Sequence, residues 1–200
     1  MNQLVKPSTN RLKHKIAEII SRLAEPLFWL PLMIWLVLRR AQLPMREQVI
    51  NYLILLVFVF IVPFGYFSYL VFVKKEVDMD FTVRSKRVGL IVKSMLSFTA
   101  APIITLFIDR LVFVITTAVY LSTLGLVLVT LKWKISFHAG LNTLIFYTVN
   151  YLYDWRYWWL FFLLIPISWA RLEMKKHNPA QLIAGVVLPS IIFMIITSIL

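Results

Sequence analysis

Long apolar runs separated by short polar segments recur along the whole chain. They cover roughly residues 22–39, 48–73, 88–108, 111–131, 139–153, 156–170 and 181–200. A helix needs about 20 apolar residues to cross the hydrocarbon core of a bilayer, and the complete runs approach that length. The pattern therefore predicts an all-α fold, a polytopic transmembrane helical bundle of about six to seven spans.

Polar residues and prolines mark the borders and interruptions of these runs. The Asp109-Arg110 pair predicts a tight turn between the third and fourth runs, and Asp154 with Arg156 separates the fifth from the sixth. Aromatic residues crowd around this last turn, as expected of anchors at a membrane interface. Kinks are predicted at three prolines inside the runs, Pro63, Pro102 and Pro166.

The start of the chain differs from the rest. Residues 1–21 are polar and basic and contain no short apolar segment followed by a cleavage site, so no signal peptide is predicted. We expect residues 1–21 to form a basic interfacial arm and residues 22–200 to form a single transmembrane helical domain.

The composition is that of a membrane protein, and it excludes sites that depend on cysteine. The chain is 60% hydrophobic and only 15% charged, with a mean hydropathy of +0.82. It contains no cysteine, which excludes disulfides and thiolate metal sites.

The net charge of +12 is explained by membrane topology rather than by nucleic acid, because no basic stripe lies on a soluble domain. With seven crossings, sixteen of the 21 Lys and Arg residues fall on the face that carries residues 1–21, 74–87, 132–138 and 171–180. Cytoplasmic loops are enriched in Lys and Arg. We therefore expect an integral, multi-pass protein with this face in the cytoplasm.

Three polar segments on that face carry the candidate chemistry. They contribute Arg84 and Arg87, then Lys134, Ser136 and His138, then Arg171, His177 and Gln181. Taken singly, each has a simpler explanation: a solvated loop, the N-cap of a helix, or a structural histidine at an interface. Their predicted position on one face favours a functional site, since polar groups are costly at a membrane boundary.

The order and spacing of these residues resemble the type 2 phosphatidic acid phosphatase superfamily, the membrane lipid phosphatases related to vanadium haloperoxidases. The family's third motif is Ser-Arg, five residues, His, three residues and Asp; here it reads Ala170-Arg171, five residues, His177, three residues and Gln181. The second motif, Pro-Ser-Gly-His, is matched by Ser136 and His138. The resemblance covers roughly residues 75–190 and implies a phosphatase-type core there.

The resemblance also implies roles for these residues. His177 would be the nucleophile that forms a phosphohistidine, and His138 the general acid for the leaving lipid alkoxide. Arg87 and Arg171 would bind the phosphate oxygens, with Ser136 donating a further hydrogen bond. No cofactor and no metal are implied, and the substrate would be a lipid phosphate of the phosphatidic acid or polyprenyl type, met among the membrane lipids.

The chain departs from the family's motifs at several positions. Gln181 stands where an aspartate would orient the nucleophile; an amide oxygen can accept the ring N–H but supplies no charge. Phe137 replaces a glycine, and Val88 follows Arg87 where a proline belongs. The first motif also lacks its lysine, because Asp80 occupies that position; Lys134 or Arg84 are possible substitutes.

These departures leave other functions open. The alternative to a phosphatase is a catalytically weak member that binds or transports lipid phosphates, and a structural or partner-binding membrane protein is a third possibility. A prenyltransferase is disfavoured, because Asp78 and Asp80 form one acidic pair and no second aspartate-rich loop follows.

Overall fold

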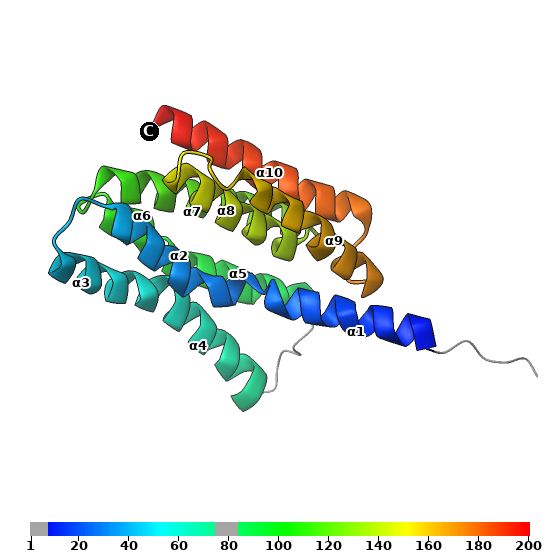
Figure 1. Cartoon of the computed structure of the whole chain (residues 1–200). Coiled ribbons are helices and arrows are strands. Elements are labelled where there is room, and N and C mark those ends of the chain that lie inside the picture. Colours follow the sequence, from blue (N-terminus) through cyan, green and yellow to red (C-terminus); the bar gives the residue numbers. More distant parts are fainter. Residues whose placement is uncertain (1–7, 75–83) are drawn as a thin grey trace, which may run out of the picture.

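A computed structural model describes residues 8–74 and 84–200, with side chains for residues 11–74 and 89–200. Every regular element in these ranges is helical, as predicted (Figure 1). The α-helices are α1 (Ser8–Leu23), α2 (Pro26–Arg40), α3 (Met45–Leu56), α4 (Val62–Ser68), α5 (Arg84–Phe98), α6 (Ala100–Thr105), α7 (Arg110–Thr130), α8 (Phe137–Leu152), α9 (Leu164–Glu173) and α10 (Pro179–Ile199). Two π-helical segments, η1 (Val57–Ile61) and η2 (Tyr69–Val73), and one 3₁₀ segment, η3 (Trp158–Leu163), complete the set.

Four stretches of the described chain are long and apolar enough to cross a membrane. They are Arg11–Arg40, Met45–Val73, Arg110–Thr130 and Pro179–Ile199, and the shorter apolar stretch Gly89–Thr105 accompanies them. A helical membrane protein is therefore supported, whereas the count of six to seven spans stays a prediction.

Prolines interrupt two of the expected runs at the places where their missing N–H groups matter. Pro102 cannot donate to the carbonyl of Phe98 four residues earlier, and helix α5 ends at Phe98 before α6 begins. Pro63 likewise has no N–H to donate to the carbonyl of Val59, four residues earlier. Val59 lies in the π-helical segment η1, which ends two residues before Pro63.

The expected run at 156–170 is not one uninterrupted α-helix. Asp154 and Trp155 adopt positive φ angles of 51° and 61° in the preceding turn, and the 3₁₀ segment η3 comes before α9. Pro166 then lies in the first turn of α9, where a missing N–H costs no helical hydrogen bond.

Helices α7, α8 and α10 pack closely because small residues line their contacts (Figure 1). A Cβ atom added at Gly185 would lie 2.7 Å from the carbonyl oxygen of Ser136, and one added at Gly140 would lie 2.6 Å from Leu126 Cδ1. Helix α2 packs against α8 on the other side, and α1 lies along α9. Residues 1–7 of the predicted interfacial arm lie outside the described residues.

The turns of the bundle gather at its two ends. At one end the Arg110 guanidinium donates to the carbonyl oxygen of Leu200 at 2.8 Å, and Arg40 stacks over the Tyr153 ring at 5.1 Å. Towards the opposite end lie the residues before α8 and the turn between α9 and α10 (Figure 1), and the α1–α2 junction lies against the first turns of α8. This second end carries the candidate site.

Candidate functional site

Two of the three predicted polar segments meet at this end of the bundle. The Lys134 ammonium donates a hydrogen bond of 2.7 Å to the carbonyl oxygen of Lys176. The Ser136 N–H donates to the carbonyl oxygen of Gln181 at 3.2 Å. Gly185 allows this approach, because a side chain there would meet the Ser136 carbonyl. The residues before α8 are therefore joined to the turn between α9 and α10.

Gln181 orients His177 at the start of α10. Asn178 caps the helix: its side chain accepts from the Gln181 N–H at 2.9 Å, and the Asn178 N–H donates back to Gln181 Oε1 at 3.2 Å. Because that N–H fixes the amide oxygen as the acceptor, His177 Nδ1, 3.2 Å from the same oxygen, must be the donor. This assignment places the ring lone pair on Nε2.

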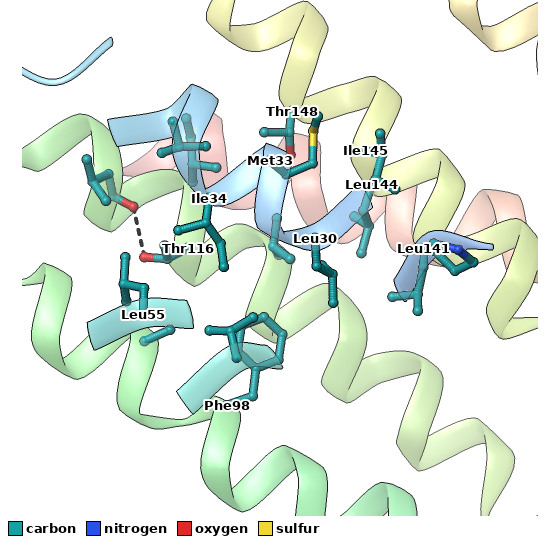
Figure 2. A pocket seen from close by; sticks show the side chains of 17 residues that line it. Leu30, Met33, Ile34, Leu55, Phe98, Thr116, Leu141, Leu144, Ile145 and Thr148 are labelled. Carbon is teal, nitrogen blue, oxygen red and sulfur yellow. Dashed lines mark hydrogen bonds between the residues drawn. The ribbon is translucent and has the colours of Figure 1, made fainter. Parts of the chain in front are cut away.

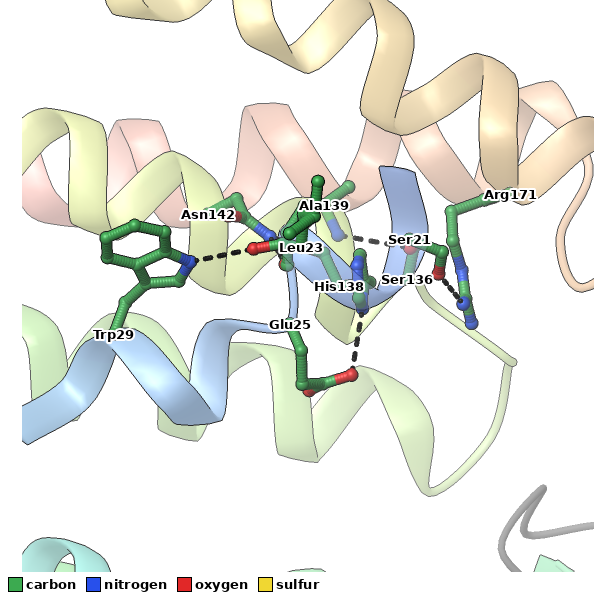
Figure 3. Close-up of polar contacts among 10 residues, drawn as sticks. Ser21, Leu23, Glu25, Trp29, Ser136, His138, Ala139, Asn142 and Arg171 are labelled. Atoms are coloured by element: carbon green, nitrogen blue, oxygen red, sulfur yellow. Dashed lines mark hydrogen bonds and ion pairs between the residues drawn. The ribbon is translucent and has the colours of Figure 1, made fainter. Parts of the chain in front are cut away.

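His138 lies in the first turn of α8 and pairs with a residue that the sequence analysis did not identify. Its Nδ1 is 3.7 Å from Oε2 of Glu25, at the α1–α2 junction (Figure 3). The imidazole is only 7% exposed. The Ser21 carbonyl lies near the ring, but among the described residues no group meets hydrogen-bond geometry with the buried Nε2.

Arg171 interacts with the α1–α2 junction and with His138. Its guanidinium donates to the Ser21 hydroxyl at 2.9 Å (Figure 3), and its positive charge acts on both Glu25 and His138. His177 also acts electrostatically on His138. We call Ser21, Glu25, His138, Arg171 and His177 the polar cluster.

His138 is neutral at physiological pH in the protein alone. It lies outside the four stretches able to cross a membrane. The pKa of His138 is lowered to about 4, mainly by burial of the ring and secondly by the neighbouring Arg171 cation. An anion bound beside Arg171 would oppose this effect, because negative charge favours the imidazolium.

The α1–α2 junction is held against α8 by hydrogen bonds to its main chain. Asn142 is buried and donates to the carbonyl oxygens of Ala24, at 2.8 Å, and of His138, at 2.7 Å. The Trp29 indole donates to the Leu23 carbonyl at 3.1 Å (Figure 3). These bonds fix the junction that presents Glu25. Glu25 could have been recognised from the sequence as a candidate, because it is a carboxylate directly before Pro26 at the edge of an apolar run.

Ser136 is the N-cap of α8, the alternative that the sequence left open. Its hydroxyl oxygen accepts from the Ala139 N–H at 3.3 Å, and the residue is fully buried. Its predicted bond to phosphate stays a prediction. Helix α5 begins at Arg84, but the side chains of Arg84 and Arg87 lie outside the described residues, as do Asp78 and Asp80.

Among the described residues, no three His, Asp or Glu side chains are grouped so that they could hold a metal ion. The polar cluster instead combines two imidazoles, a guanidinium and a carboxylate, groups that can bind an anion and move a proton. Comparison of the chain with protein-family models, curated proteins and solved structures found no match.

Proposed function

We propose that this chain is a membrane-embedded phosphatase or phosphotransferase that acts on a lipid phosphate of the phosphatidic acid or polyprenyl type. One observation carries the proposal: Lys134, His138, Arg171, His177 and Gln181, from two distant segments, lie together at one end of the bundle. The contacts Lys134–Lys176 and Ser136–Gln181 join these segments directly. Guanidinium and imidazole groups match the charge and geometry of a phosphate.

In the proposed reaction, His177 Nε2 attacks phosphorus and forms a P–N bond while the P–O bond to the lipid alkoxide breaks. Gln181 holds the Nδ1–H of the nucleophile, and Arg171 stabilises charge on the non-bridging oxygens. His138 gives a proton to the alkoxide oxygen. Water then attacks the phosphohistidine and loses a proton to His138 as the P–N bond breaks, which yields phosphate and a lipid alcohol.

In this proposal, substrate binding favours the protonated form of His138 that the reaction needs. His138 is neutral in the protein alone, whereas a phosphate beside Arg171 adds negative charge close to the imidazole. Its protonation is therefore coupled to the arrival of the anion, and the general acid is charged when the leaving group requires it.

The proposal is tested by phosphate release from short-chain lipid phosphates, with protein purified in detergent. We expect release by the unaltered chain and its loss in His177→Ala. An acid-labile phosphohistidine should be trapped on the unaltered chain only. Release that is unchanged in His177→Ala would reject the assignment of the nucleophile.

A second candidate function is the binding or transport of lipid phosphates without turnover. The neutral Gln181 beside His177 and the deep burial of His138 favour it, because both reduce the charge available for catalysis. Saturable binding of a lipid phosphate, equal in the unaltered chain and in His177→Ala and without a trapped intermediate, would identify this function instead.

We further propose that the shorter helical stretches also cross the bilayer, which gives about six to seven spans with a phosphatase-type core at residues 75–190. Helices α7, α8, α9 and α10 run in alternating directions along the bundle (Figure 1), which supports this count. The excess of Lys and Arg at the end that carries the polar cluster supports a cytoplasmic position for it.

A further inference from the structure

An apolar cavity lies between helices α2, α7 and α8 (Figure 2). Of its 17 lining residues only Thr116 and Thr148 are polar, and the Thr116 hydroxyl is hydrogen-bonded to the Val112 carbonyl at 2.8 Å. The cavity has a volume of about 80 Å³, whereas a single water needs about 10–15 Å³. Apart from these two threonines the lining side chains are all apolar, so an apolar occupant fits best.

The cavity begins next to the polar cluster. Pro26, which lines it, directly follows Glu25, and Leu141, on the opposite wall, lies three residues after His138 on α8. Asn142 ties the two walls together at this end through its bond to the Ala24 carbonyl. The cavity and the polar cluster are therefore neighbours along both α2 and α8.

The lining residues of the cavity on α2 extend over about the thickness of one leaflet of a bilayer. Its lining on α2 extends from Pro26 to Val37, which corresponds to about 16 Å at 1.5 Å per residue. The hydrocarbon core of a bilayer is about 30 Å thick, so one leaflet spans about 15 Å. The lining of the cavity on α2 is therefore about as long as the part of a lipid chain that lies in one leaflet.

We propose that this cavity binds one hydrocarbon chain of the lipid phosphate whose headgroup occupies the polar cluster. The inference rests on the proposed function and specifies its substrate as a lipid with at least one long chain. Because a membrane lipid is already in hydrocarbon, moving the chain into the cavity gains little free energy. Its contribution is positioning: a fixed chain holds the phosphorus atom in place for attack.

The test narrows the cavity and compares two substrates in lipid nanodiscs. Ile145, half-buried on the α8 wall, is replaced in Ile145→Phe, and the matched control is Ile183→Phe, at an exposed residue of α10 outside the cavity. We expect kcat/KM for octyl phosphate to fall at least about tenfold in Ile145→Phe, while p-nitrophenyl phosphate, which has no chain, stays within about twofold. The control should change neither value.

The possible failures are distinct. If the unaltered chain hydrolyses neither substrate, the proposed function is wrong and the inference falls with it. If it hydrolyses both and Ile145→Phe affects both equally or neither, the cavity is not a chain site, although the phosphatase assignment stands. Should Ile145→Phe not fold, Ala101→Leu narrows the same cavity from α6.

Crosslinking gives a second measurement that does not depend on turnover. An alkyl phosphate with a diazirine at the end of its chain should label residues at the far end of the cavity, such as Val37, Leu55 or Val112. A phosphatidylcholine with the same diazirine should not. Labelling confined to the outer face of α10, or equal labelling by both lipids, would show that the cavity does not select the substrate chain.

Discussion

An aspartate or glutamate beside His177 would both orient the imidazole and add negative charge, whereas Gln181 can only orient it. Its amide oxygen fixes the orientation and tautomer of His177, with Nδ1 and Oε1 3.2 Å apart, but it adds no negative charge. Replacing the orienting aspartate of a serine-protease triad by its amide costs about 10⁴ in kcat. Geometry without charge is therefore expected to give slow turnover here.

Gln181→Glu keeps the shape of this side chain and adds the charge. We expect kcat to rise at least about tenfold. The melting temperature should also rise slightly, because an acidic residue in the first turn of a helix contributes about 0.3–1 kcal/mol. The control Ala180→Glu places the same charge one residue earlier, on an exposed position. It should raise the melting temperature alone, and an equal gain in kcat would show that Gln181 has no special role.

Glu25 is expected to act by positioning His138. Without the carboxylate 3.7 Å from Nδ1, the imidazole protonates the leaving alkoxide less well, so Glu25→Gln should lower kcat for an alkyl phosphate about 10²-fold. p-Nitrophenyl phosphate has a leaving group that needs no proton, and its hydrolysis should change little. Glu18→Gln, at a carboxylate of α1 paired with Arg22, is the control. Equal losses on both substrates would indicate a purely structural contact.

The buried His138 also predicts how stability depends on pH. Its pKa is about 4 in the folded protein and about 6.5 in the unfolded chain, so the unfolded state binds more protons between these values. The stabilisation is complete above pH 6.5 and is lost as pH falls towards 4, by about 3 kcal/mol. Thermal unfolding in detergent should show this loss, and His138→Gln should reduce it. A profile that is the same in both proteins would contradict the assignment.

At the scale of elements, the sequence predicts helix interruptions and caps correctly where their cause lies within a few residues. Pro102 and Pro63 mark the interruptions of the expected runs, and Asp109 caps α7 by accepting from the Val112 N–H at 3.1 Å. The contact between His177 and Gln181 was expected from a spacing of one helical turn, but His177 precedes the N-cap Asn178, and the capping box of α10 places the Gln181 oxygen beside it instead. Glu25 was missed because its partner His138 lies in a distant element, and no periodicity relates the two.

The crossing of α8 and α10 depends on Gly185, and this dependence gives a prediction for the element. In Gly185→Ala the new Cβ would meet the Ser136 carbonyl oxygen, a backbone atom, at 2.7 Å, so the helices must separate. We expect a loss of about 1–3 kcal/mol of stability and lower activity, since the Ser136–Gln181 bond joins the two parts of the site.

Gly65→Ala is the matched control for this crossing. An added Cβ at Gly65, in α4, meets no atom within 4 Å, and the substitution should be neutral or stabilise the helix by up to about 1 kcal/mol. Melting temperatures of the two variants in the same detergent compare them directly. Equal stability of both variants would show that the close approach of α8 and α10 is not needed.

At the scale of the molecule, the apolar pattern predicted the fold class, because a helix that crosses a membrane must be recognisable from its own residues. The number of crossings is harder to predict. Helix α8 has 16 residues and is about 24 Å long, shorter than the hydrocarbon core of about 30 Å. A helix of this length crosses only where the bilayer thins or neighbouring helices cover its ends, and composition alone does not decide between these arrangements and a helix that stays within the bundle.

Single cysteines on either side of α8 test this crossing and the orientation together. The chain has no cysteine of its own, so Lys132→Cys and Arg156→Cys, both at exposed turn residues, carry no background. In intact cells, a maleimide that cannot cross membranes should label the cysteine at position 156, and position 132 should react only after permeabilisation, because we propose that the end with the polar cluster faces the cytoplasm. The reverse pattern would place the site on the outer face. Labelling of both positions from one side would show that α8 does not cross, and at most six of the seven predicted runs could then be spans.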